Sequence, residues 1–333
     1  MIFIENEGIT DPRMNLALEE YILRNFDAKD YLLFYINEPS IIIGRNQNTL
    51  EEINHDYVED KGIHVVRRVS GGGAVYHDLG NLNFSFLTDY DRKHLNNFAK
   101  FTGPVIKVLN AMGVNAELSG RNDILAEGKK ISGNAQYASV KRMLSHGTLL
   151  YNTDLSEVGR ALNVKMSKIE SKGHKSVRSR VANITEFLDE KMSIEEFRSR
   201  LLKGLYDERD DFETYHLTEE QWAKVRQLHD EKYNTWEWNF GSSPKFNIQR
   251  AKRFPLGEID LRLFVEKGHI TEMKIFGDFF GKEPVANLEN LLKGRPYRRS
   301  EIATALQGVD LSLYFGSIET DEFTRLVYGD DEE

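Results

Sequence analysis

The sequence contains no cysteine. Disulfide bonds, thiolate metal sites, iron–sulfur ligation and a cysteine nucleophile are therefore excluded. Long apolar runs are missing as well, because no segment approaches the roughly 18 residues that a membrane-spanning helix requires. Residues 1–7 have neither the basic region nor the apolar region of a signal peptide. These absences predict a cytoplasmic protein with no membrane partner.

Positive charge is in short supply, with 44 Lys and Arg residues against 53 Asp and Glu residues and a net charge of −9. This balance argues against bulk binding to nucleic acid, so we predict no nucleic-acid partner, but it leaves room for a local basic site. Hydrophobic residues make up 40% of the chain and charged residues 29%, which is typical of a globular protein with a sizeable core. A length of 333 residues favours two domains.

The most informative stretch is residues 67–78, which read R-R-V-S-G-G-G-A-V-Y-H-D. Three consecutive glycines allow positive φ angles and let a ligand approach the backbone amides, while two arginines supply permanent charge. This combination favours a phosphate-bearing ligand. Strands are expected on both sides, at 63–68 and 82–87, and a hairpin would need only about two residues between them. Neither the P-loop motif nor the dinucleotide fingerprint matches this stretch.

A second stretch, residues 120–136, predicts a hairpin with its turn at Glu127 and Gly128. The turn places Lys129 and Lys130 at the start of the returning strand. Successive strand side chains face opposite sides, so one of these lysines faces inward and the other faces water. Small and polar residues at 132–135 would let a ligand come close.

A third stretch, residues 165–180, carries six basic residues opposed by a single glutamate. Such a run is typical of a solvated face. A cationic loop that closes over an anionic ligand is the alternative.

These stretches resemble motifs of the lipoate protein ligase A family, within the larger biotin and lipoate ligase group. The matching segments are R-R-x-x-G-G-G-x-V-x-H-D at 67–78, G-R-N-D at 120–123, K-x-S-G-x-A at 130–135, H-G-T-L-L at 146–150, K-G-x-x-S-V-R-S-R at 172–180 and W-E-W-N-F-G at 236–241. The resemblance implies activation of lipoate by ATP to lipoyl-AMP with release of pyrophosphate. Transfer to a lysine of a lipoyl acceptor domain would follow, in the glycine-cleavage H protein or a 2-oxoacid dehydrogenase E2, and would salvage free lipoate.

The same resemblance implies roles for individual residues. Lys130 is the expected catalytic residue, in contact with the acyl carbonyl and the phosphate, and Lys129 is expected at the surface. ATP and the adenylate are expected to bind at Arg67, Gly72, Gly73, Ala74, Val75, Asp123, Lys130, His146, Gly147, Thr148, Ser176 and Arg178. Lipoate is expected at Leu16, Tyr35, Ser70, Gly73, His77 and Lys130.

ATP and Mg²⁺ are the implied co-substrate and metal, lipoate is the substrate, and no prosthetic group is expected. Asp123 is the candidate magnesium ligand, and a strand-edge carboxylate bonded to nearby amides is the alternative. Core packing is the alternative for Leu16 and Tyr35, and a turn residue is the alternative for His146.

The pattern of strands and helices predicts an α+β fold, with a largely antiparallel mixed sheet flanked by helices. Residues 1–243 would form the large catalytic domain and residues 244–333 a small α+β accessory domain. The remaining strands are expected at 31–36, 40–44, 258–265 and 270–276. Helices are expected from Pro12 onward, at 51–61, 98–112 and 183–206, within 217–233, and near 284–292, 299–306 and 319–327.

Other functions are less favoured by the sequence. An octanoyl or lipoyl transferase of the same superfamily would pass the acyl group through a cysteine, which this chain lacks. A non-catalytic lipoate or adenylate sensor would keep the pocket without the chemistry. The glycine- and arginine-rich signature of biotin ligases is absent, and His77-Asp78 lacks the further ligands of a metal phosphohydrolase.

Overall fold

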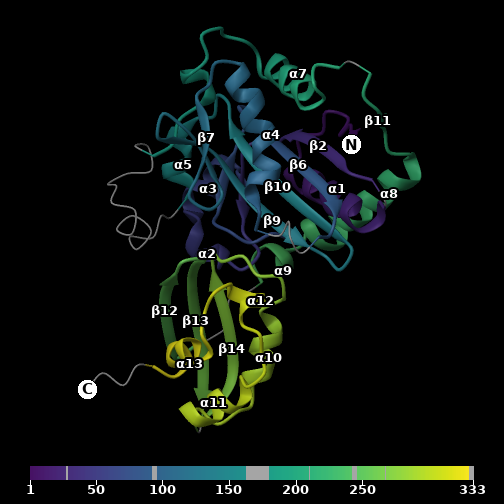
Figure 1. The fold of residues 1–333 in the computed structure, drawn as a ribbon. Helices are drawn as coiled ribbons and strands as arrows, with labels where there is room; N and C mark the ends of the chain where they lie inside the picture. The colour runs from purple at the N-terminus through teal and green to yellow at the C-terminus, as the bar shows by residue number, and fades with distance from the viewer. Residues whose placement is uncertain are drawn as a thin grey trace. The chain divides into compact units, whose positions relative to one another are not determined.

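The computed structural model describes residues 1–27, 29–91, 96–162, 180–209, 211–241, 246–266 and 268–329 (Figure 1). Two predicted site residues, Ser176 and Arg178, lie outside these ranges, so their roles stay predictions. Contacts divide the chain into two compact units. Unit 1 comprises Met1–Ile43, Glu51–Arg68 and Ala74–Asn239, and unit 2 comprises Gly44–Leu50, Val69–Gly73 and Phe240–Glu333. The units are discontinuous in sequence, whereas the predicted domains meet at residue 243.

Unit 1 is built on an eight-stranded mixed sheet. Its strands, in spatial order, are β11 (Thr214–Tyr215), β1 (Ile2–Ile4), β2 (Tyr31–Ile36), β6 (Asn81–Asp89), β10 (Arg142–Leu150), β9 (Lys129–Ala138), β8 (Asp123–Ala126) and β7 (Ala116–Ser119). Strand β1 pairs in parallel with β11 and β2, and the remaining pairs are antiparallel. A smaller sheet places β3 (Ser40–Ile43) between β4 (His64–Arg67) and β5 (Val75–His77). The predicted α+β class with a largely antiparallel sheet is confirmed.

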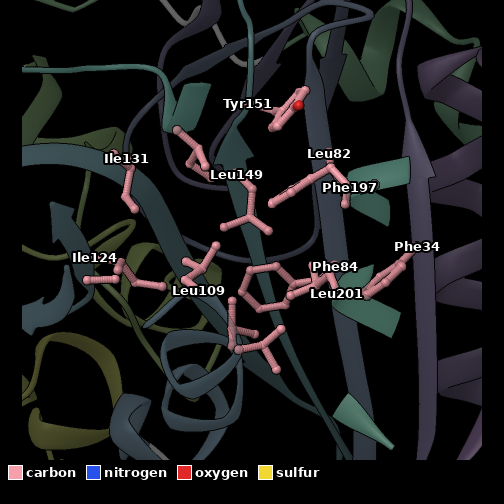
Figure 2. Close-up of a cluster of buried hydrophobic side chains, with 14 of the residues drawn as sticks. Phe34, Leu82, Phe84, Leu109, Ile124, Ile131, Leu149, Tyr151, Phe197 and Leu201 are labelled. Carbon is pink, nitrogen blue, oxygen red and sulfur yellow. The ribbon is translucent and has the colours of Figure 1, made fainter. Parts of the chain in front are cut away.

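The main sheet separates an apolar core from a polar face. Leu82 and Phe84 of β6 point to the core, which also takes side chains from helices α4 (Phe98–Ala111) and α7 (Ile194–Leu205) (Figure 2). Burial of each such side chain contributes roughly 1.5–3 kcal/mol. The alternate residues of β6 face the other way, toward helix α1 (Pro12–Asn25), because strand side chains alternate. Asp11 caps α1 as predicted, since its side chain accepts a hydrogen bond from the Arg13 amide.

Two of the expected helices are interrupted. Residues 51–61 form α2 (Thr49–Glu52) and α3 (His55–Lys61), because the Asn54 side chain accepts from the Tyr57 amide and starts a new helix. Residues 183–206 form a short 3₁₀ helix, η2 (Ile184–Glu186), and then α7, whose N-cap is Ser193. The continuous helices predicted at both places are therefore wrong.

The other helices of unit 1 are α5 (Leu155–Ala161), α8 (Glu219–Leu228) and α9 (Trp236–Asn239), and a π-helical turn, η3 (His229–Tyr233), continues α8. In the described ranges no helix has both the length and the apolarity needed to cross a membrane. The cytoplasmic location stays a prediction.

Unit 2 contains the antiparallel sheet β12–β13–β14, with strands Ile248–Phe254, Gly257–Glu266 and His269–Gly277. Helices α10 (Ala286–Leu292), α11 (Arg299–Ala305), α12 (Ser312–Phe315) and α13 (Thr320–Tyr328) accompany the sheet, and the small core includes Leu261, Ile275 and Phe315. The strands predicted at 258–265 and 270–276 correspond to β13 and β14, which pair as a hairpin. Strand β12 was missed because its sequence is dominated by charged and polar residues.

Candidate functional site

Lys130 lies near the start of β9 and forms an ion pair with Asp123 of β8. The Lys130 Nζ atom is 2.7 Å from Asp123 Oδ1, and both side chains are partly buried, at 34% and 23% exposure. The neighbouring Lys129 is more exposed, at 48%, and pairs with Glu186 at 3.5 Å. The hairpin therefore separates the two lysines, and only Lys130 meets the predicted metal ligand.

Two backbone features set the position of Lys130. The β8–β9 register shifts between Ile124 and Leu125, so β9 carries one extra residue beside Lys130, as in a β-bulge. The Lys130 amide donates to the Arg180 carbonyl at 2.7 Å, and the Lys130 carbonyl accepts from the Ala182 amide at 3.0 Å. Arg180, the last residue of the stretch 165–180, and Ala182 just beyond it are thus hydrogen-bonded to the backbone of this lysine.

Gly133 leaves room for the Lys130 side chain. A Cβ atom at Gly133 would lie 3.0 Å from Lys130 Nζ and 3.2 Å from Cε. The Gly133 amide donates to the Thr148 hydroxyl of β10 at 3.2 Å. Gly147, beside it, is tightly enclosed, because a Cβ atom there would collide with Asn134 Oδ1. The structure thus brings Lys130, Asp123, Gly147 and Thr148 together on adjacent strands.

His146 belongs to a buried polar cluster on the face of the sheet that α1 covers. Its Nδ1 atom lies 2.9 Å from Oε1 of Glu19, a residue that is only 1% exposed. The same carboxylate accepts from the hydroxyls of Tyr35, at 3.4 Å, and of Ser85. Burial, followed by the charge of Glu19, raises the pKa of Tyr35 well above its usual value. Tyr35 is therefore a neutral hydroxyl in this cluster.

His77 and Arg68 extend the cluster. Burial lowers the pKa of His77 to about 3, and the charges of Arg68 and His146 add to this effect. Burial also lowers the pKa of Arg68 to about 10, which leaves the guanidinium charged at neutral pH. Leu16 is buried at 2% exposure on α1. The face of the main sheet that α1 covers thus carries neutral and charged polar side chains, and α1 adds the apolar Leu16.

Arg67 is held by the segment that carries the W-E-W-N-F-G motif. Its amide donates to Asn239 Oδ1 at 2.9 Å, and its Nε atom donates to the Trp238 carbonyl at 2.9 Å. In return, the Trp238 indole donates to the Arg67 carbonyl at 2.7 Å. Burial lowers the pKa of Arg67 to about 10, so it too stays charged at neutral pH.

A buried ion pair contacts the segment that carries the W-E-W-N-F-G motif. Glu20 of α1 is 1% exposed, accepts from Lys232 Nζ at 2.7 Å and accepts from the Tyr233 hydroxyl at 2.5 Å. Lys232 Nζ also lies 3.9 Å from the centre of the Trp238 ring. Burial acts to raise the pKa of Glu20, but the charge and hydrogen bond of Lys232, the hydrogen bond of Tyr233 and the charge of Arg24 together lower it below its usual value.

The glycine loop, Val69–Gly73, belongs to unit 2 by its contacts. Gly72 adopts φ +94°, a left-handed conformation that favours glycine, as the sequence indicated. A Cβ atom at Gly71 would collide with the Phe279 carbonyl, whereas one at Gly73 would meet no atom of the described residues within 4 Å. The Ser70 carbonyl accepts from the Arg45 amide at 2.9 Å. Ala74 and Val75 belong to unit 1, where Val75 pairs with Ile42.

Within the described ranges, no group of three or more His, Asp or Glu side chains is arranged to hold a metal ion. Mg²⁺ in nucleotide sites takes one or two carboxylates from the protein and the rest of its ligands from phosphates and water. Asp123 therefore fits as a single ligand, and no protein cage is needed.

Several residues of these clusters were not identified from the sequence as site residues. Glu19, Arg68 and Asn239 each contact a predicted site residue or share its cluster. Asn239 belongs to the W-E-W-N-F-G segment at 236–241, but the resemblance assigned no role to any residue of that segment. Glu19 carried no local signal, since its partner His146 is 127 residues away.

Comparisons with known proteins agree with these motifs. Residues 11–206 match the family model described as "Lipoyl protein ligase A/B catalytic domain", and residues 243–327 match "Bacterial lipoate protein ligase C-terminus". The chain is 58% identical to lipoate-protein ligase LplJ of Bacillus subtilis (strain 168), covering 98% of this chain and 100% of that protein. It is 52% identical to lipoate–protein ligase 1 of Staphylococcus aureus (strain Mu50), covering 98% and 100%.

Three solved structures are also similar. LipL1 of P. falciparum in complex with lipoate has a TM-score of 0.77 and 25% identity, covering 98% of each chain. A bipartite lipoate protein ligase described with its E2 lipoyl domain, from Thermoplasma acidophilum, has a TM-score of 0.64 and 37% identity, covering 74% of this chain and 98% of that one. A lipoate-protein ligase A bound with ATP has a TM-score of 0.60 and 36% identity, covering 69% and 94%.

Proposed function

This chain belongs to the lipoyl protein ligase A/B family and is a lipoate–protein ligase, and we propose that it joins lipoate to acceptor lysines through a lipoyl-AMP intermediate. ATP would react with the lipoate carboxylate to release pyrophosphate, and the acceptor amine would then displace AMP. One observation carries this proposal: the half-buried Lys130–Asp123 pair, set by the bulge and by Gly133.

The first step must bring together two anions, the lipoate carboxylate and the triphosphate. A positive group about 4 Å from a negative one contributes about 4 kcal/mol at an effective dielectric constant of about 20. We assign the charges of Lys130 and Arg67 to this step. From their place in the glycine motif we also assign Gly72 and Gly73 to the phosphates, since backbone amides of this kind bind phosphate. His146, Gly147, Thr148, Ala74 and Val75 are the further residues that we assign to the nucleotide or the adenylate.

The second step needs a neutral acceptor lysine, although a free lysine has a pKa of about 10.4 and is almost wholly protonated at pH 7. Like charges favour deprotonation, so the Lys130 ammonium would lower the pKa of an incoming amine. The same ammonium would hold the acyl carbonyl as negative charge develops on it. Asp123 keeps Lys130 in place before the substrates bind.

Mg²⁺ would be held by Asp123 together with the phosphates of ATP. When bound, it would neutralise charge on the phosphates. Lipoate would lie along Leu16, Tyr35, Ser70 and His77, where each methylene that is buried contributes about 0.8 kcal/mol. We propose as acceptors the lipoyl domains of 2-oxoacid dehydrogenase E2 components and the glycine-cleavage H protein.

The direct test is incubation of the full chain with ATP, Mg²⁺, lipoate and apo acceptor domains. Intact mass spectrometry should find one added lipoyl group per acceptor, and pyrophosphate should exchange into ATP only when lipoate is present. Acyl transfer without ATP, or lipoate binding without AMP formation, would contradict the proposal.

Lys130→Ala should abolish both activities. The Lys130–Asp123 pair is partly exposed, so its loss should cost only about 0.2–1 kcal/mol of stability. Lys129→Ala is the matched control, because the two lysines are adjacent and Lys129 pairs with Glu186 instead. A fully active Lys130→Ala variant would remove the central assignment.

A further inference from the structure

His77 stands at the end of a chain of three buried asparagines. Asn6 Nδ2 donates to Asn15 Oδ1 at 3.1 Å, Asn15 Nδ2 donates to Asn37 Oδ1 at 2.9 Å, and Asn37 Nδ2 lies 3.0 Å from His77 Nδ1. All four residues are at most 5% exposed. We call Asn6, Asn15 and Asn37 the asparagine chain.

The direction of this chain is fixed by backbone carbonyls. The Ile9 carbonyl, which can only accept, lies 2.9 Å from Asn6 Nδ2 and 2.9 Å from Asn15 Nδ2. The nitrogen of each amide must therefore be on that side. Asn15 then presents a donor to Asn37 Oδ1, so Asn37 presents its own donor to His77.

A donor facing His77 Nδ1 requires that this nitrogen accept. A neutral imidazole carries its single proton on one nitrogen, so the proton is on Nε2. The depressed pKa of His77, caused by burial and by the nearby charges of Arg68 and His146, agrees with a neutral ring. His77 Nε2 is excluded from solvent and has no hydrogen-bond partner within the described part of the chain.

A buried donor with no partner is costly, and few are found in native proteins. This one is therefore expected to meet an acceptor on a ligand. The proposed lipoate site offers such an acceptor. Lys130, assigned to the acyl carbonyl, is 34% exposed, whereas His77 is 3% exposed, so His77 belongs to the deeper end of that site. The acceptor lysine must reach the carbonyl, so the other end of lipoate, its dithiolane ring, occupies the deeper position.

We propose that the asparagine chain fixes His77 as the Nε2–H tautomer, and that this neutral donor hydrogen-bonds the dithiolane ring of bound lipoate. His77 thereby distinguishes lipoate from octanoate, which has the same carboxylate and chain but no sulfur. Sulfur is a weak acceptor. A neutral donor suits it, because a charged group would lose more hydration on burial. This inference rests on the proposed function, and it makes Asn15 and Asn37 positioning residues.

The tautomer of His77 can be measured directly, without an activity assay. Nitrogen-15 NMR of the histidine-labelled full chain should find His77 protonated on Nε2 and unprotonated on Nδ1. Asn37→Asp replaces the donor by an acceptor, so the proton should move to Nδ1. A wild-type ring protonated on Nδ1, or on both nitrogens, would overturn the inference.

Kinetics of AMP formation supply the second test. The amide nitrogen of glutamine can take the place of His Nε2, whereas asparagine reaches only the Nδ1 position. His77→Asn should raise the half-saturation concentration of lipoate about tenfold, and His77→Gln should raise it less. Asn37→Asp should resemble His77→Asn while thermal unfolding shows a folded protein. In both variants the half-saturation concentration of octanoate should rise less than that of lipoate, so the ratio of the two should change, while that of ATP should stay within about twofold of wild type.

The outcomes separate the two proposals. If His77→Asn weakens lipoate and octanoate equally, the donor does not meet the dithiolane ring and the inference is wrong. If the wild-type chain forms no AMP from lipoate and ATP, the proposed function fails, whereas the NMR experiment still reports the tautomer.

Discussion

Replacing Gly73 with alanine asks directly whether the glycine loop binds ATP. A Cβ atom at this position would meet no atom of the described residues within 4 Å, and Gly73 does not adopt a left-handed φ angle. The substitution should therefore leave the folded protein intact. By restricting the unfolded chain, it should even stabilise the protein by about 0.4–1 kcal/mol.

The same Cβ atom would stand between the backbone amide and a phosphate. Hydrogen bonds to a charged group contribute about 1.5–3 kcal/mol, so their loss corresponds to a roughly 10- to 100-fold weaker affinity. We therefore expect Gly73→Ala to raise the half-saturation concentration of ATP by that factor. Lipoate-dependent exchange of pyrophosphate into ATP, at varied ATP concentration, measures it.

Gly71→Ala is the contrasting variant. Its Cβ atom would collide with the Phe279 carbonyl, so the backbone must shift, at a cost of about 1–3 kcal/mol. Thermal unfolding should therefore rank Gly71→Ala below wild type and Gly73→Ala at or above it. Unchanged ATP saturation in a folded Gly73→Ala variant would refute the idea that the Gly73 amide approaches a phosphate.

Three further substitutions probe the groups around the site. Gly133→Ala puts a Cβ atom 3.0 Å from Lys130 Nζ, so acyl transfer should slow about tenfold in single-turnover assays while thermal unfolding changes little. Asn239→Ala removes the acceptor for the Arg67 amide; ATP should bind about tenfold more weakly in exchange assays, with lipoate saturation unchanged. Glu20→Gln should destabilise the protein by about 2 kcal/mol at neutral pH. Because the pKa of Glu20 is lowered from 4.5, this difference should shrink as the pH falls below 4.5 in unfolding experiments, and a constant difference would contradict the role of its charge.

Local sequence was sufficient for the Lys130 hairpin. Glu127 and Gly128 both adopt positive φ angles, +48° and +78°, as a two-residue hairpin turn requires. The turn sets the register, and the register determines which lysine faces water. The capped start of α1 was predictable for the same reason, since Asp11 and Pro12 act within one helical turn.

Contacts between distant residues could not be predicted in this way. Arg67 and Asn239 are 172 residues apart, and neither residue indicates the other. Asn6, Asn15 and Asn37 occur in ordinary turn, helix and strand-end contexts, so their alignment depends on the packing of α1 against the sheets. The prediction of continuous helices at 51–61 and 183–206 was wrong for a local reason. Asn54 and Ser193 are N-cap residues inside segments that are otherwise helical in pattern.

The packing of Val69–Gly73 with unit 2 limits how the polypeptide can be divided. A fragment that stops at residue 241 would retain the glycines but lose Phe279, whose carbonyl borders Gly71. Such a truncation would therefore remove the residues of unit 2 that the glycine loop packs against. On the proposed role of the glycine loop, we expect a two-piece version to bind ATP normally only after the C-terminal piece is added back in trans.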